Sequence, residues 1–159
     1  MKMKAIMIRI MFVCHGNICR SPMAEFIFKK LALDASVADD FYVCSSATST
    51  EEIWRGIGNP VYPPAREELS RHGISCEGKR AVQLTADDAD KYDLFVGMDS
   101  ANIRNMKRIL GDKAEGKIFK LMDYTERKGD VSDPWYTDRF DIAYRDIYDG
   151  CKALLNTLL

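Results

Sequence analysis

Two kinds of apolar pattern alternate along the chain. Four short runs are dense in branched and aromatic residues, which is typical of strands buried on both faces: 6–13, 41–45, 93–98 and 117–122. Between and after them, apolar residues recur at three- and four-residue steps, in a segment that begins at 21 and in 65–72, 100–110 and 137–159. This alternation predicts one α/β domain over 1–159, with a four-stranded parallel sheet flanked by helices on both faces.

Local signals place the ends of these helices. Ser21, followed by proline, is a helix start, and Gly73 and Gly111 are typical of the position just after a helix end. In the first helix, the charged residues Glu25, Lys29 and Lys30 lie opposite the apolar face. Segments 48–64 and 123–136 are expected to be loops, because the first is rich in glycine and proline and the second is polar.

The composition and net charge exclude several classes of function. The chain has 159 residues, 47% of them hydrophobic and 30% charged, which indicates a globular domain with its own core. A net charge of −1 argues against binding to nucleic acid through a broad basic surface and against a polybasic membrane anchor. The five cysteines are odd in number and irregularly spaced, so a reducing compartment is expected.

The N-terminus superficially resembles a secretory leader, because it is basic and then apolar. However, Arg9 interrupts the apolar run, no small-residue cleavage site follows, and no window reaches the ~18 apolar residues of a membrane span. We therefore expect a cytoplasmic protein, not bound to a membrane, whose first strand starts near Ala5.

The loop after the first strand combines a nucleophile with anion-binding features; it reads Val13-Cys14-His15-Gly16-Asn17-Ile18-Cys19-Arg20-Ser21-Pro22. Between a buried strand and a helix, such a loop curls its backbone N–H groups around an anion, and the helix N-terminus adds positive potential. Gly16 allows the positive φ that the curl needs, and the Arg20 fork grips phosphate oxygens. Cys14 ends the strand, so its sulfur is expected to face the loop's centre as a thiolate aimed at phosphorus.

Segment 13–22 strongly resembles the phosphate loop of low-molecular-weight protein tyrosine phosphatases. Further motifs follow in the family's order over nearly the whole chain: Ser45-Ser46-Ala47-Thr48-Ser49, Ile57-Gly58-Asn59-Pro60, His72-Gly73-Ile74, Met98-Asp99 and Asp133-Pro134-Trp135-Tyr136. The resemblance implies a phosphotyrosine phosphatase with Cys14 as the nucleophile that forms a cysteinyl-phosphate. It implies that Arg20 stabilises charge on the transferring group, and that Asp133 is the general acid and then the base.

The resemblance also implies supporting roles. Asn17 would shape the loop by hydrogen bonds, with Ser45 among its partners, and Ser21 would place a hydroxyl near the thiolate. Cys19 would trap an oxidised nucleophile as a reversible disulfide. Residues expected to line the phosphate or substrate site are His15, Gly16, Asn17, Ile18, Cys19, Ser21, Trp135, Tyr136 and Trp54. Trp54 would form the side of the cleft opposite Trp135 and Tyr136, although segment 50–56 is longer than the usual family loop.

Two departures bear on the site. Many family members have His-x-Ala-Arg where this chain has Lys79-Arg80-Ala81-Val82, so support of the loop is expected to be altered or absent. Segment 123–141 carries six acidic and three basic residues. We interpret it as a solvated loop; the sharper hypothesis is that it disfavours acidic phosphopeptides.

Other functions remain open as alternatives. Protein-arginine phosphatases of the same family have Thr where this chain has Ile18, whose bulk favours an aryl phosphate. An arsenate reductase needs relay cysteines, which 79–93 lacks. A phosphocarrier or non-catalytic phosphate-binding module would not need both Arg20 and Asp133. The sequence implies no metal or other cofactor; the expected partners are a phosphotyrosine protein as substrate and inorganic phosphate as product.

Overall fold

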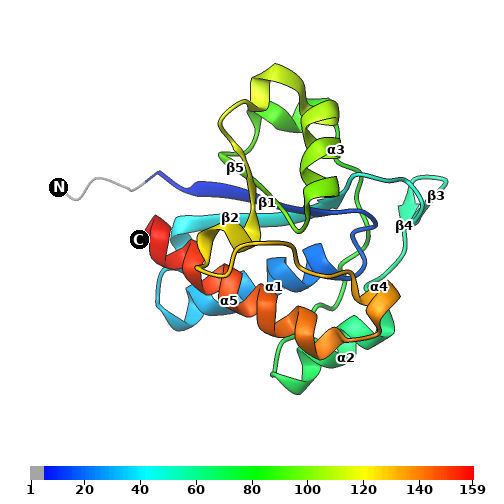
Figure 1. Ribbon diagram of the computed structural model, residues 1–159, viewed down its shortest axis with the longest axis vertical. Coiled ribbons are helices and arrows are strands. Elements are labelled where there is room, and N and C mark those ends of the chain that lie inside the picture. The colour runs from blue at the N-terminus through cyan, green and yellow to red at the C-terminus, as the bar shows by residue number, and fades with distance from the viewer. Residues whose placement is uncertain (1–5) are drawn as a thin grey trace.

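A parallel sheet of four strands forms the centre of the computed structural model, which describes residues 6–159 (Figure 1). The strand order is β2-β1-β5-β6, with β1 (Ile8–Cys14), β2 (Phe41–Ala47), β5 (Leu94–Gly97) and β6 (Ile118–Lys120). All three pairings are parallel, which confirms the predicted sheet. The expected strand start near Ala5 lies outside the described residues.

Helices cover both faces of this sheet, as predicted. Figure 1 shows α3 on one side and the other three long helices on the opposite side. Their bounds are α1 (Arg20–Asp34), α2 (Pro63–Arg71), α3 (Ser100–Leu110) and α5 (Phe140–Leu158). Short 3-10 helices lie at Ala38–Asp40, Ala86–Asp90, Gly111–Ala114 and Leu121–Tyr124. No helix within residues 6–159 is both long enough and apolar enough to cross a bilayer.

Strand β1 is buried on both faces because successive side chains point to opposite sides of a strand. Ile10 and Phe12 pack into the core beneath α1 and α5, whereas Met11 and Val13 pack into the second core beneath α3. Complete burial of side chains of this size stabilises the fold by ~1.5–3 kcal/mol each. The end of β1, where Cys14 lies, is therefore fixed by two cores at once.

Several predicted boundaries differ from the structure by one or two residues, and three segments differ more. Segment 48–64 is not only a loop: it contains a hairpin of β3 (Ile53–Trp54) and β4 (Ile57–Gly58), and α2 already begins at Pro63. The hairpin turn needs positive φ at Arg55 (51°) and Gly56 (78°), and arginine is a weak sequence signal for that geometry.

The other two of these segments lie nearer the C-terminus. Strand β6 is shorter than 117–122, because a 3-10 helix begins at Leu121. Segment 123–136 contains the start of α4 (Pro134–Thr137), and α5 starts at Phe140 rather than at 137. The left-handed conformation of Asp138 (φ 59°) separates the two helices.

Candidate active site

The loop between β1 and α1 surrounds the Cys14 sulfur with donors. The backbone N–H groups of Asn17 and Ser21 donate to Cys14 Sγ at 3.3 and 3.4 Å, and Ser21 Oγ lies 3.0 Å from it. Hydrogen-bond donors and the N-terminus of α1 thus surround the sulfur, where they can stabilise negative charge. The buried Cys14 side chain, at the end of a strand, is well placed for nucleophilic attack.

Carbonyl groups of the same loop point away from the sulfur. The carbonyls of Cys14 and His15 accept from the N–H groups of Thr48 and Ser49 at 3.0 Å, and the Ile18 carbonyl accepts from Tyr62 at 2.9 Å. In a trans peptide the N–H points opposite to the preceding C=O. Outward carbonyls therefore turn the following N–H groups inward, as an anion-binding loop requires.

The positive φ of the loop lies at Asn17 (58°), not at Gly16, which corrects the sequence interpretation. Asparagine tolerates this conformation because its short amide can form local hydrogen bonds. Gly16 has a different use: a Cβ there would lie 3.3 Å from Cγ of Glu52, so the glycine lets a neighbouring loop approach closely.

Asn17 holds the loop by its buried amide. Val82 N–H donates to Oδ1 at 3.0 Å, which sets the amide orientation, and Nδ2 then donates to Ser21 Oγ at 2.7 Å and Ser45 Oγ at 3.0 Å. Since the Ser21 hydroxyl accepts from Asn17, its own proton is available for Cys14 Sγ. The contact of Asn17 with Ser45 is the one that the resemblance implied.

A cluster of charges around the buried Glu25 carboxylate completes this network and was missed from the sequence. Ser45 Oγ donates to Glu25 Oε1 at 2.6 Å; Lys29 Nζ lies 2.6 Å from Oε2 of that carboxylate and Lys79 Nζ 3.7 Å from its Oε1. Lys79 also donates to the Ser45 carbonyl at 2.9 Å. Burial lowers the pKa of Lys79, and Glu25 opposes that shift.

This cluster corrects one expectation and decides between the two alternatives of another. Glu25 is 5% exposed and does not lie on a solvated helix face. The i, i+4 spacing of Glu25 and Lys29 did not indicate burial of Glu25, because ion pairs on exposed helix faces have the same spacing. At 79–82 the support of the loop is altered rather than absent, since Lys79 and the Val82 N–H supply it.

Arg20 lies at the floor of the site and is 3% exposed. Its Nη1 donates to Asp99 Oδ2 at 2.7 Å and to the Val131 carbonyl at 2.8 Å, and its Nη2 lies 3.5 Å from Asp133 Oδ2. Burial opposes the charge, but Cys14, Asp99 and Asp133 outweigh it and raise the pKa of Arg20. Asp99 was noted in the sequence only as a motif; its place just after a central strand is the signal for this role.

A cleft of about 360 Å³ opens above the loop. Its lining residues are Cys14, His15, Gly16, Ile18, Cys19, Arg20, Glu51, Glu52, Asp133, Trp135 and Tyr136. Asp133 caps α4 by accepting from the Trp135 N–H at 3.0 Å. The structure thus brings Cys14, Arg20 and Asp133 to one cleft, while Asn17, Ser21 and Ser45 lie beneath it.

Trp54 is not among the residues that line this cleft, contrary to expectation. Its side chain is 74% exposed and has the Arg55 guanidinium 5.6 Å from its ring. The longer 50–56 segment turns as a hairpin, so Glu51 and Glu52 reach the cleft instead. No pattern in the sequence indicated these two carboxylates.

The remaining cysteines differ chemically from Cys14. Burial, and then the charges of Cys14 and Asp133, raise the pKa of the Cys19 thiol, which keeps it protonated. Burial likewise raises the pKa of Cys151. A disulfide between Cys14 and Cys19 stays a prediction, because all five cysteines are free in this structure.

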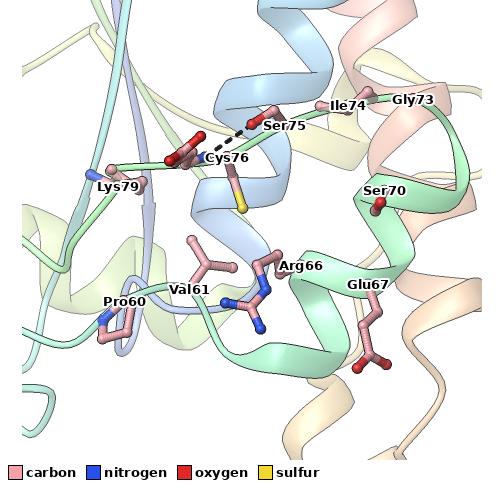
Figure 2. Close-up of a pocket in the computed structure, with 12 residues that line it drawn as sticks. Pro60, Val61, Arg66, Glu67, Ser70, Gly73, Ile74, Ser75, Cys76 and Lys79 are labelled. Atoms are coloured by element: carbon pink, nitrogen blue, oxygen red, sulfur yellow. Dashed lines mark hydrogen bonds between the residues drawn. The ribbon is translucent and has the colours of Figure 1, made fainter.

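A larger cavity lies elsewhere and lacks this chemistry (Figure 2). It has a volume of about 660 Å³ and shares no lining residue with the cleft. Figure 2 shows the Cys76 sulfur directed toward Val61 and Arg66. Burial raises the pKa of this thiol although Arg66 opposes the shift. The chemistry of the lining therefore favours the smaller cleft as the active site.

Comparison with known proteins identifies the family of the chain. Residues 9–159 match the model of the low molecular weight phosphotyrosine protein phosphatase family. The chain is 39% identical over 154 residues to the low molecular weight protein-tyrosine-phosphatase YfkJ of Bacillus subtilis, covering 96% of each chain. It is 36% identical over 151 residues to the rat low molecular weight phosphotyrosine protein phosphatase, covering 92% of each.

Solved structures show the same relationship. The crystal structure of YfkJ superposes with a TM-score of 0.91 at 38% identity, over 98% of this chain and 96% of that one. The low molecular weight protein tyrosine phosphatase of Streptococcus pyogenes superposes with a TM-score of 0.85 at 35% identity, over 96% and 94%. With its fold and nearly its whole length matched, the chain belongs to the low-molecular-weight phosphotyrosine protein phosphatase family.

Proposed function

We propose that the chain hydrolyses phosphotyrosine in proteins in two steps, through a phosphoryl group held on Cys14. The observation that carries this proposal is the convergence of Cys14, Arg20 and Asp133 on one cleft, with three hydrogen-bond donors around the Cys14 sulfur. No step needs a metal or another cofactor.

In the first step, the Cys14 thiolate attacks phosphorus and the bond from phosphorus to the tyrosine oxygen breaks. Inward N–H groups of the loop and the Arg20 guanidinium hold the three non-bridging oxygens, where charge is stabilised. Asp99 keeps the guanidinium oriented through Nη1. Asp133, protonated at this stage, gives its proton to the leaving phenolate oxygen.

In the second step, the Asp133 carboxylate takes a proton from water as that water attacks phosphorus. The bond from sulfur to phosphorus breaks, which releases inorganic phosphate and restores the Cys14 thiolate. The Ser21 hydroxyl, 3.0 Å from the sulfur, stabilises the negative charge that returns there. Atoms and protons balance, because the phenol leaves with the proton that water later restores to Asp133.

Aromatic substrate specificity is supported by the rim of the cleft. Trp135 and Tyr136, 54% and 85% exposed, present ring faces next to Asp133, and the Trp135 ring centre lies 4.9 Å from that of Tyr62. A phenyl ring packs well against such faces.

The test is hydrolysis of p-nitrophenyl phosphate and a phosphotyrosine peptide by the unchanged protein, Cys14→Ser and Asp133→Ala. We expect no turnover without the Cys14 thiol. For Asp133→Ala we expect a loss of roughly 10²–10⁴ in kcat on the peptide, whose leaving group needs the proton, and a smaller loss on p-nitrophenyl phosphate. Full activity in Cys14→Ser would exclude this mechanism.

One observation favours phosphoarginine as an alternative substrate. Glu51 and Glu52 line the cleft, and carboxylates attract a guanidinium leaving group. Ile18, 8% exposed, offers that group no hydrogen bond, so tyrosine remains the proposal. Parallel assays on phosphoarginine and phosphotyrosine peptides decide between them. The cytoplasmic location also stays a prediction, tested by cell fractionation.

A further inference from the structure

Two carboxylates stand at the mouth of the cleft and belong to the segment that departs from the expected loop. Glu51 and Glu52 precede the β3–β4 hairpin and line the cleft together with His15 and Asp133. The positive charge of Arg20 does not balance them, because it is buried at the floor and paired with Asp99 and Asp133. The rim therefore presents an acidic surface to whatever surrounds the phosphorylated residue.

Contacts with Asn59 and with the phosphate loop position these carboxylates. The Asn59 side chain donates to Glu52 Oε2 at 2.7 Å, its backbone N–H donates to the Glu52 carbonyl at 2.8 Å, and the Glu52 side chain packs beside Gly16. His15 Nε2 lies 3.1 Å from Glu51 Oε2, and both of these side chains are more than half exposed. Glu52 is therefore held in place at the rim, and Glu51 lies beside His15 there.

Some acidic residues of 123–141 are paired with basic side chains. In 123–141, Asp130 binds Lys120 and Asp141 binds Arg139, while Arg127 of the same segment binds Asp146 and Asp149 of α5. Within the described residues, Asp133 is the sole member of 123–141 whose carboxylate lines the cleft. Discrimination between acidic and basic substrate segments at the mouth of the cleft is thus assigned to residues 51 and 52 rather than to segment 123–141.

From this arrangement we infer that the preferred substrates are phosphotyrosine segments with basic flanking residues, and that Glu51 and Glu52 are the residues that select them. This inference rests on the proposed phosphotyrosine phosphatase function. An arginine or lysine beside the phosphotyrosine would meet one of these carboxylates, whereas an acidic neighbour would be repelled. Exposed charge pairs of this kind change association by about two- to fivefold each, and salt weakens them.

The experiment compares kcat/KM for three phosphotyrosine peptides of equal length, with lysine, alanine or glutamate flanking the phosphotyrosine, at 50 and 500 mM NaCl. The proteins are the unchanged chain, Glu51→Gln, Glu52→Gln and the double variant, and each rate is normalised to that protein's rate on p-nitrophenyl phosphate. Glutamine keeps the size and an acceptor for Asn59. The matched control is Glu67→Gln, an exposed carboxylate of α2 that lines the other cavity.

We expect the unchanged chain and Glu67→Gln to prefer the lysine peptide over the glutamate peptide by about tenfold at low salt, and the double variant by less than about twofold. High salt should reduce the preference in all of them. If the unchanged chain hydrolyses p-nitrophenyl phosphate but does not distinguish the three peptides, this inference is overturned while the proposed function stands. The same holds if the double variant keeps the preference for the lysine peptide. Failure to hydrolyse either kind of substrate would overturn the proposed function, and the inference with it.

Discussion

Replacing Asn17 by alanine tests how far one side chain holds the phosphate loop. The substitution removes three hydrogen bonds, to the Val82 N–H and the hydroxyls of Ser21 and Ser45. A neutral hydrogen bond contributes a net ~0.5–1.5 kcal/mol, and alanine at the left-handed φ of this position adds ~1 kcal/mol of strain. We therefore expect the free energy of unfolding to fall by about 3–5 kcal/mol.

Asn17→Gly separates the two contributions, because glycine loses the same hydrogen bonds but adopts positive φ without strain. The alanine variant should be less stable than the glycine variant by about 1 kcal/mol. Urea unfolding under reducing conditions measures both, with the slope of the transition compared to check that the unfolded states are alike.

The same variants report on the nucleophile. Without the Asn17 amide, the Ser21 hydroxyl is no longer held in place to donate to Cys14 Sγ, so the rate at which iodoacetamide alkylates Cys14 at pH 7 should fall. If Asn17→Ala stays within about 1 kcal/mol of the unchanged protein and its alkylation rate is the same, the amide does not hold the loop.

Three further outcomes are expected. Asp99→Asn should lower kcat/KM for p-nitrophenyl phosphate by roughly tenfold, because Arg20 loses its ion-pair partner while the shape of the side chain is kept; an unchanged value would contradict this role. Lys79→Met should lower kcat and the rate at which Cys14 is alkylated at pH 7, and Lys79→Arg should restore both; equal effects in the two variants would contradict a role for the charge. The free energy of unfolding should fall above about pH 9, because the unfolded chain releases the proton of the Cys151 thiol there while burial raises the pKa of this thiol in the folded protein. Cys151→Ala should make the dependence of this free energy on pH less steep by ~1.4 kcal/mol per pH unit, and an unchanged dependence would contradict the role of Cys151.

The strands and helices could be predicted because burial imposes a periodicity on the sequence. Segment 6–13 reads as a strand since Ile10 and Phe12 face one core and Met11 and Val13 the other. The hairpin at 53–58 could not be predicted, because Arg55 takes a conformation that arginine rarely adopts and the strands have only two residues each.

Some site residues could likewise be predicted from the sequence and others could not. Cys14 and Arg20 lie in one contiguous loop whose chemistry is visible in the sequence, and Asp133 was reached through the family resemblance. The roles of Glu25, Lys79, Asp99 and the pair Glu51–Glu52 were missed. Glu25 follows the loop closely but has the i, i+4 spacing to Lys29 that exposed helix pairs also have, whereas the other residues reach the site from distant parts of the chain. Their roles depend on which segments the fold brings together, and no local pattern encodes that.

The attachment of the Cys14 sulfur to the central strand has a consequence for how such an enzyme can diversify. Exposing the loop requires β1 to separate from both cores, so the reaction geometry opens only when the whole domain unfolds. The residues that meet the substrate's surroundings lie on the short hairpin segment and on α4, at the periphery. Mutations there alter recognition at little cost in stability, so new substrates can be acquired while the chemistry stays unchanged.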